Sequence, residues 1–73
     1  MSSNMYWMPK PTDRKQVDTN LKRAIANWKN TPCELNTEDL DYLKGLKAGG
    51  IKDVQPIISA IETHGAVLIE EEW

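Results

Sequence analysis

Reactive side chains are scarce in this 73-residue sequence, which has one cysteine and one histidine. A single cysteine, Cys33, excludes a disulfide within the chain. Cys33 and His64 together do not supply the three or four nitrogen and sulfur ligands of a usual zinc site. The sequence therefore predicts no bound metal and no cofactor.

Long apolar runs are also missing. No stretch approaches the roughly 18 apolar residues of a membrane-spanning helix, so no association with the membrane is expected. Residues 1–8 lack the basic start and the long apolar segment of a secretory signal peptide. Unpaired thiols are typical of a reducing compartment. Together these features predict a cytoplasmic protein.

Motifs for catalysis are absent as well. The glycine pair Gly49-Gly50 has neither the spacing nor the lysine of a phosphate-binding loop. Nucleophilic catalysis needs an activated thiol or hydroxyl, and no motif connects Cys33 with His64. The acidic run 70–72 lies at the chain end, where too little protein surrounds it for acid–base catalysis by a buried carboxyl group. We therefore expect that the protein is not an enzyme.

Size and composition predict one small domain over residues 1–73, with residues 1–3 disordered. The chain is 40% hydrophobic and 27% charged, which is typical of a globular domain. A chain this short buries only about 60% of the surface that its unfolded form exposes, so its stability margin is thin. Because neither a disulfide nor a metal is expected, a homodimer is a candidate source of extra stability.

Hydrophobic spacing predicts five elements: a strand over 4–8, helices over 12–30, 36–48 and 53–64, and a strand over 66–71. A strand needs a neighbour, and only the two terminal segments are strand-like. The expected fold is therefore α+β and mainly helical. Its order is β-α-α-α-β, with three short helices packed on a small two-stranded sheet that the chain ends form.

The helix over 12–30 has the clearest pattern. Asp13 and Gln16 make a candidate capping box at its start. Apolar residues then follow at helical spacing and define the face expected to be buried, namely Val17, Leu21, Ala24, Ile25 and Trp28. In the later helices, we expect Asn36 or Thr37 and then Asp53 to cap the starts, and Gly49-Gly50 and Gly65 to end them.

The three tryptophans are informative in so short a chain. Trp28 fits the buried face of its helix. Trp7 and Trp73 lie on the two terminal strands and allow two interpretations. They stack on each other across the sheet, or one of them is an exposed anchor for a partner, since tryptophan is enriched at interface hot spots.

Charge is segregated along the chain. Residues 1–30 have a net charge of +4 and residues 31–73 a net charge of −6. A basic helix face attracts nucleic-acid phosphates, and the candidate residues for such binding are Arg14, Lys15, Lys22, Arg23 and Lys29. The pI of about 5.2 and the lack of lysine and arginine in the helix over 53–64 make nucleic acid the less favoured partner.

The favoured hypothesis is a small non-enzymatic regulator or inhibitor that binds another protein. Its acidic and aromatic surface is predicted to comprise Glu70, Glu71, Glu72, Trp73 and Trp7. The simpler interpretation of 70–72 is a charged guard against strand aggregation. Alternatives are a nucleic-acid-associated transcriptional regulator that uses the basic face of the helix over 12–30 and, less favoured, a subunit of a larger enzyme complex. Proteins of this type are common on bacteriophages and other mobile elements, and the type alone suggests that source.

Overall fold

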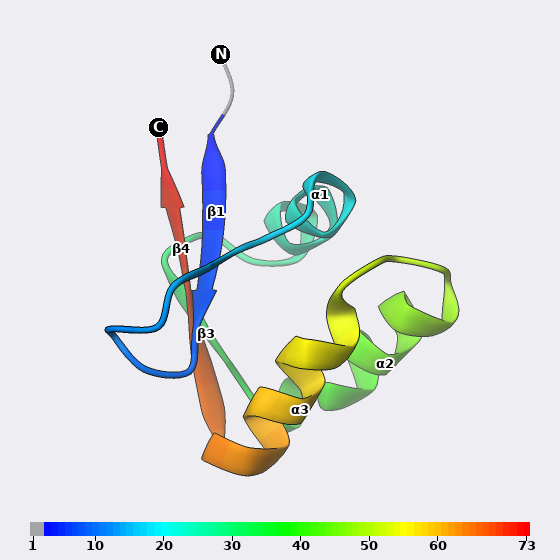
Figure 1. Ribbon diagram of the computed structural model, residues 1–73. Helices are drawn as coiled ribbons and strands as arrows, with labels where there is room; N and C mark the ends of the chain where they lie inside the picture. The colour runs from blue at the N-terminus through cyan, green and yellow to red at the C-terminus, as the bar shows by residue number, and fades with distance from the viewer. Residues whose placement is uncertain (1–2) are drawn as a thin grey trace.

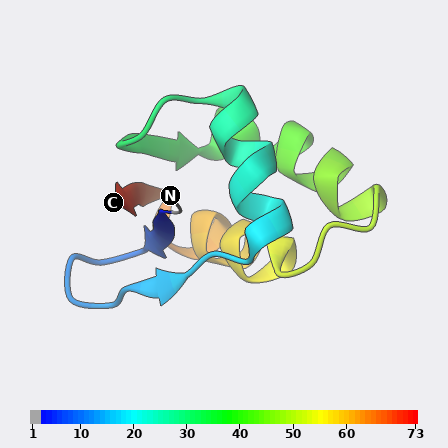
Figure 2. The same cartoon turned by 90° about the horizontal axis from the view of Figure 1, so that it is seen from above.

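A four-stranded antiparallel sheet carries three helices on one face in the computed structural model, which describes residues 3–73 (Figure 1, Figure 2). The strand order is β2-β1-β4-β3. The elements are β1 (Asn4–Met8), β2 (Lys15–Gln16), α1 (Thr19–Trp28), β3 (Cys33–Asn36), the 3-10 helix η1 (Thr37–Asp39), α2 (Leu40–Ala48), α3 (Val54–His64) and β4 (Ala66–Glu72).

The expected two-stranded sheet is wrong. β1 and β4, from the two ends of the chain, do pair at the centre of the sheet, but β2 and β3 flank them. The order of elements is therefore β-β-α-β-α-α-β, in which the short η1 precedes α2. The extra strands leave β1 and β4 with neighbours on both sides and place the sheet edges at β2 and β3.

The central strands alternate between the two faces of the sheet. Trp7 pairs with Ile69 and Met5 with Glu71, and these residues face the helices. Met5, Trp7 and Ile69 are buried there. The intervening residues of both strands point to the opposite face, because successive side chains in a strand alternate.

The helix predicted over 12–30 begins later than expected, at Thr19. The residues before it are extended, and Val17 donates its backbone N–H to the carbonyl oxygen of Met5 at 2.8 Å. Val17 is therefore buried from β-like backbone and not from a helix face. The cap is Asp18, whose carboxylate accepts a hydrogen bond from the N–H of Asn20, so the capping box of Asp13 and Gln16 is wrong.

β3 occupies a segment that was expected to be a loop. Leu35 is fully buried in the hydrophobic cluster between the sheet and the helices, and Glu34 points away from the helices. The strand ends where Asn36 caps η1, as predicted, by accepting a hydrogen bond from the N–H of Glu38. The backbone N–H of Asn36 donates in turn to the carboxylate of Asp39. This reciprocal cap turns the chain from the sheet edge into α2.

Glycine ends both later helices, as predicted. Gly49 follows α2, and Gly50 has a φ of +91°. Gly65 follows α3 with a φ of +90°. Asp53 precedes α3 but has a left-handed φ of +64° and its side chain makes no capping hydrogen bond, so its predicted capping role is wrong. The tight turn at Gly65 delivers the chain directly into β4.

One hydrophobic cluster lies between the sheet and the helices. Its fully buried members include Leu21, Ile25, Leu43, Ile57 and Ile61. All three α-helices contribute to this cluster, and within residues 3–73 no helix covers the other side of the sheet (Figure 2). None of the helices in residues 3–73 is long and apolar enough to cross a membrane.

Candidate protein-binding face

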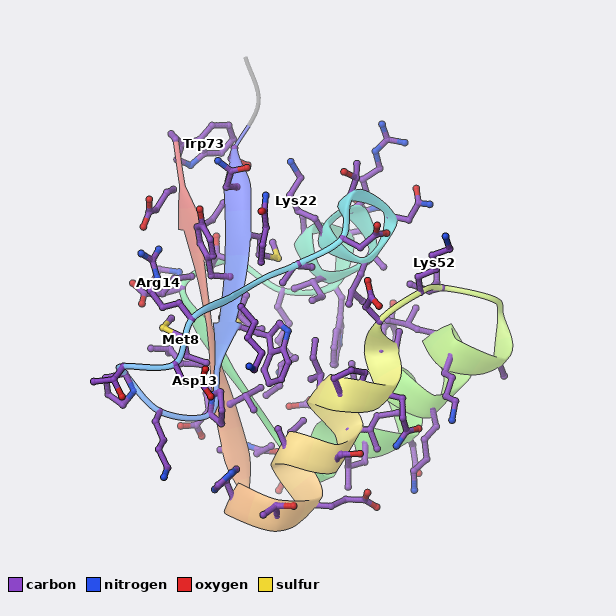
Figure 3. All side chains as sticks on the ribbon, viewed as in Figure 1. Met8, Asp13, Arg14, Lys22, Lys52 and Trp73 are labelled. Carbon is purple, nitrogen blue, oxygen red and sulfur yellow. The ribbon has the colours of Figure 1, made fainter. Side chains whose placement is uncertain are left out.

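The side of the sheet that the helices leave uncovered is here named the helix-free face. Figure 3 shows Met8 and Arg14 on this side of the strands, away from the helices. The outward-pointing residues of the three longer strands form its centre and follow from the register: Tyr6, Met8, Glu34, Leu68, Glu70 and Glu72. An apolar middle is thus bordered by three carboxylates.

Arg14 covers the part of the helix-free face near Tyr6 and the end of β4 at Glu72. Its guanidinium carbon lies 4.2 Å from the centre of the Tyr6 ring, within range of a cation–π interaction. The same guanidinium forms an ion pair with Glu72. Both contacts depend on the chain that leads into β2 running back beside β1. Arg14 consequently neutralises Glu72 and shields one face of Tyr6 from solvent.

A shallow groove of about 300 Å³ opens at the other end of this face. Pro9, Lys10 and Pro11 of the β1–β2 loop form one wall, and Glu34 and His64 also contribute to its polar border. Leu68 lies in the groove and is 41% exposed. The loop beside Met8 leaves that side chain only 3% exposed although it lies on the uncovered side of the sheet. The groove is therefore an apolar depression with charged edges.

Two carboxylates adjoin Leu68 without being used inside the protein. Glu34 is its direct cross-strand partner on β3, and Glu70 is two residues along β4 on the same face. Within residues 3–73, neither Glu34 nor Glu70 forms an ion pair or a side-chain hydrogen bond. An exposed leucine beside two unpaired carboxylates is the most distinctive feature of this face.

The structure separates the predicted acidic and aromatic site residues. Trp7 is buried in the core with 6% exposure, and Trp73 is 84% exposed beyond the end of β4 (Figure 3). The two indoles therefore do not stack, and the aromatic stack in residues 3–73 joins Trp28 to Tyr42 instead. Glu70 and Glu72 lie on the helix-free face, but Glu71 faces the helices. Of the five predicted residues, the register thus places only Glu70 and Glu72 on the helix-free face.

The carboxylate of Glu71 forms hydrogen bonds within the chain and is not available to a partner in the way that Glu70 is. Its carboxylate accepts hydrogen bonds from the hydroxyls of Ser3 and Thr31, the latter at 2.8 Å. These hydrogen bonds, first that of Ser3, lower the pKa of Glu71 below its ordinary value. Ser3 is buried by this contact, and its carbonyl oxygen accepts a hydrogen bond from Lys22. Residues 1–2, which were expected to be disordered with Ser3, lie outside the described residues.

The predicted basic residues do not form one helix face. Arg14 and Lys15 precede α1, and Lys29 follows it. Four of the five interact with oxygen atoms of the chain itself: Arg14 with Glu72, Lys15 with Asp13, Lys22 with Ser3 and Lys29 with Asp39.

Arg23 is the exception among these five. It is exposed on α1 and forms no ion pair or side-chain hydrogen bond in the part of the chain that the structure describes. Two of the four contacts, Arg14 with Glu72 and Lys29 with Asp39, join a basic residue of the first half of the chain to an acidic residue of the second half.

Within residues 3–73, the side chains that could act as nucleophiles or metal ligands do not form a cluster. Among residues 3–73, no group of three or more histidine, cysteine, aspartate or glutamate residues is placed to hold a metal ion. Burial raises the pKa of the Cys33 thiol, with a smaller opposing effect of Lys29 and a smaller raising effect of Asp39. At neutral pH the thiol is consequently a weaker nucleophile than an exposed cysteine.

Sequence reasoning missed Glu34, Leu68 and the position of Arg14 over Tyr6. The alternation of Cys33–Asn36 was a usable signal, since its second and fourth residues are polar and its third is leucine.

No protein-family model, curated protein or solved structure matches this chain.

Proposed function

We propose that this chain is a non-enzymatic cytoplasmic regulator or inhibitor that binds another protein through its helix-free face. The observation that supports this proposal is Leu68, a large apolar side chain with 41% exposure between carboxylates that have no partner in residues 3–73. An uncovered sheet face with an apolar centre and a charged border has the composition of a protein interface, with its apolar core and polar rim.

The shape of this face favours a macromolecular partner over a small substrate. A groove of about 300 Å³ is at the lower limit of pockets that enclose a ligand. It opens onto the uncovered side of the sheet, where Leu68 is exposed. Trp73 is retained in the proposal as a contact at the edge of the interface, whereas Trp7 is assigned to the core.

Nucleic acid is the weaker alternative. Phosphate binding needs cations that are free to release their counterions, and only Arg23 of the five candidate residues is free of contacts with oxygen atoms of this chain within residues 3–73. The carboxylates of the helix-free face would also repel phosphate. Duplex DNA binding that falls steeply with salt and is lost in Arg23→Gln would support the alternative.

The experiment that tests the proposal is comparative capture from lysate of the source cells. The immobilised chain is compared with Leu68→Ala and with the control Tyr42→Ala, because Leu68 and Tyr42 have similar exposures of 41% and 45%. Tyr42 lies on α2 and stacks on Trp28, so urea unfolding is used to check that both variants are folded. We expect a protein that the original chain and Tyr42→Ala retain and that Leu68→Ala loses. Identical captured sets from all three chains would refute the helix-free face as the binding surface.

A further inference from the structure

Resting on the proposed function, we propose that the partner binds the helix-free face with an extended basic segment, in which one aliphatic or aromatic side chain is flanked by lysine or arginine. The apolar side chain enters the groove beside Leu68, and the cations meet Glu34 and Glu70.

The sheet register places the two carboxylates around Leu68 in two directions. Met8, Leu68 and Glu34 form one row across β1, β4 and β3, because Leu68 is the partner of both other residues. Directly paired residues on neighbouring strands have Cβ atoms about 5 Å apart. Glu70 is two residues along β4, a distance of about 7 Å. Leu68 therefore has one carboxylate next to it on the neighbouring strand, that of Glu34, and another two residues further along its own strand, that of Glu70.

The size of the groove fits one large side chain. About 300 Å³ is too little for most drug-sized ligands but sufficient for a leucine, methionine or phenylalanine from a partner. Pro9 and Pro11 make one wall from residues with restricted backbone freedom. Such a wall loses little entropy on binding, which favours an anchor at this point.

The charges of the face select a basic occupant. Glu72 is already paired with Arg14. Glu34 and Glu70 form no ion pair among residues 3–73, although Lys10 and His64 line the groove together with Glu34 and Arg14 lies over Tyr6, the cross-strand partner of Glu70. Lysine and arginine have long flexible stems, so cations within two residues of the apolar anchor reach both carboxylates. An acidic segment or a nucleic-acid phosphate would be repelled.

A second copy of this chain is a poorer occupant. In a twofold-symmetric dimer the same patch meets itself, which would bring the unpaired Glu34 and Glu70 of one copy towards those of the other. Repulsion between like charges is costly at an interface. The charge pattern therefore favours a different protein over self-association through this face.

A synthetic peptide provides the test. The probe is acetyl-Gly-Ser-Lys-Thr-Leu-Thr-Lys-Ser-Gly-amide, in which threonine favours extended backbone and each lysine is two residues from leucine. Its binding to the ¹⁵N-labelled chain is followed by NMR. We expect saturable shifts at peptide concentrations up to about 1 mM, centred on Leu68, Glu34 and Glu70. Control peptides replace the leucine with alanine or both lysines with glutamate.

Three variants of the chain separate binding from folding. Glu34→Gln and Glu70→Gln should each weaken peptide binding by at least about threefold and leave the urea midpoint unchanged, because these carboxylates support no contact within residues 3–73. Glu62→Gln is the matched control on the exposed surface of α3 and should bind as the original chain does.

Defined outcomes overturn the inference. Equal affinity for the lysine and glutamate peptides, or shifts that centre on α1, would exclude a basic segment on this face. A dimer detected by light scattering and lost in Leu68→Ala would assign the face to a second copy. If the peptide fails while lysate capture still depends on Leu68, the proposed function stands and the basic segment is refuted.

Discussion

Replacing Trp7 with alanine tests whether this residue belongs to the core, as the structure places it, or to a binding surface, as the sequence predicted. Trp7 lies in the central strand β1, is 6% exposed and belongs to the hydrophobic cluster between the sheet and the helices. Its removal leaves a cavity that β1 cannot close without disturbing its pairing with both β2 and β4.

The expected loss is large for so small a protein. Tryptophan-to-alanine substitutions in cores cost about 3–5 kcal/mol. A domain of 73 residues has a total free energy of unfolding of about 4–11 kcal/mol. Each kcal/mol changes the Tm of a domain of this size by about 4–8 °C, so the Tm of Trp7→Ala should fall by about 12–40 °C. The variant is expected to be unfolded at room temperature if the free energy of unfolding of the original chain lies at the lower end of this range, and folded with a reduced Tm if it lies at the upper end.

Urea and thermal unfolding followed by far-ultraviolet circular dichroism measure this loss without relying on tryptophan fluorescence. Trp73→Ala is the matched control, because Trp73 is 84% exposed and its removal should change the free energy of unfolding by no more than about 0.5 kcal/mol. Equal stabilities of the two variants would refute the assignment of Trp7 to the core and of Trp73 to the surface.

Three further predictions concern single residues. Gly65→Ala should lower the free energy of unfolding by about 1–2 kcal/mol, because the φ of +90° is unfavourable for alanine although there is space for its Cβ atom. The control is Gly45→Ala, inside α2, where a Cβ atom also has space. This substitution should raise the free energy of unfolding by about 0.5–1 kcal/mol. The stability advantage of the original chain over Glu71→Gln should be complete above the ordinary glutamate pKa and should shrink as the pH falls through the lowered pKa of Glu71. Cys33 should react with a maleimide more slowly than a free cysteine peptide at about pH 8, since burial raises its pKa, and urea should abolish the difference.

Each of these predictions has a clear contrary result. Equal stability changes at Gly65 and Gly45 in urea unfolding would contradict the conformational argument. A difference between the original chain and Glu71→Gln that stays constant from about pH 7 to about pH 3 would show that the carboxylate charge is not what matters. A Cys33 thiol that reacts as fast in the native protein as in urea would contradict its protection by burial.

The terminal strands and the later helices were predictable because their signals are local. The strand predicted over 4–8 was confirmed at the same residues, and the strand predicted over 66–71 was confirmed with one further residue, Glu72. Gly65 and the Gly49-Gly50 pair ended their helices as expected. In β4, simple alternation also separated the buried Val67 and Ile69 from the outward side chains.

The two edge strands were missed because little in their own residues requires them. β2 consists of Lys15 and Gln16, two exposed polar residues that form a strand only because they pair with β1. Val17 then fits helical spacing by coincidence, which extended the predicted helix too far towards the amino terminus. β3 is four residues long and follows Pro32, so its alternation is too short to outweigh a loop assignment.

The candidate site was only partly predictable for the same reason. Alternation in β4 places Glu70 and Glu72 together, but the position of Glu34 beside Leu68 exists only through the pairing of β3. The contact of Arg14 with Tyr6 and Glu72 depends on the return of the chain towards β2. Charge counts along the sequence did not reveal that most of the basic residues of the first half interact with the chain's own oxygen atoms.

The most direct test of the helix-free face is an NMR titration of the ¹⁵N-labelled chain with the protein that it captures. The account predicts that the largest amide shifts lie in β4 and β3, around Leu68, Glu70 and Glu34, with little change in α1. Shifts concentrated in α1 around Arg23, with β4 unaffected, would contradict it.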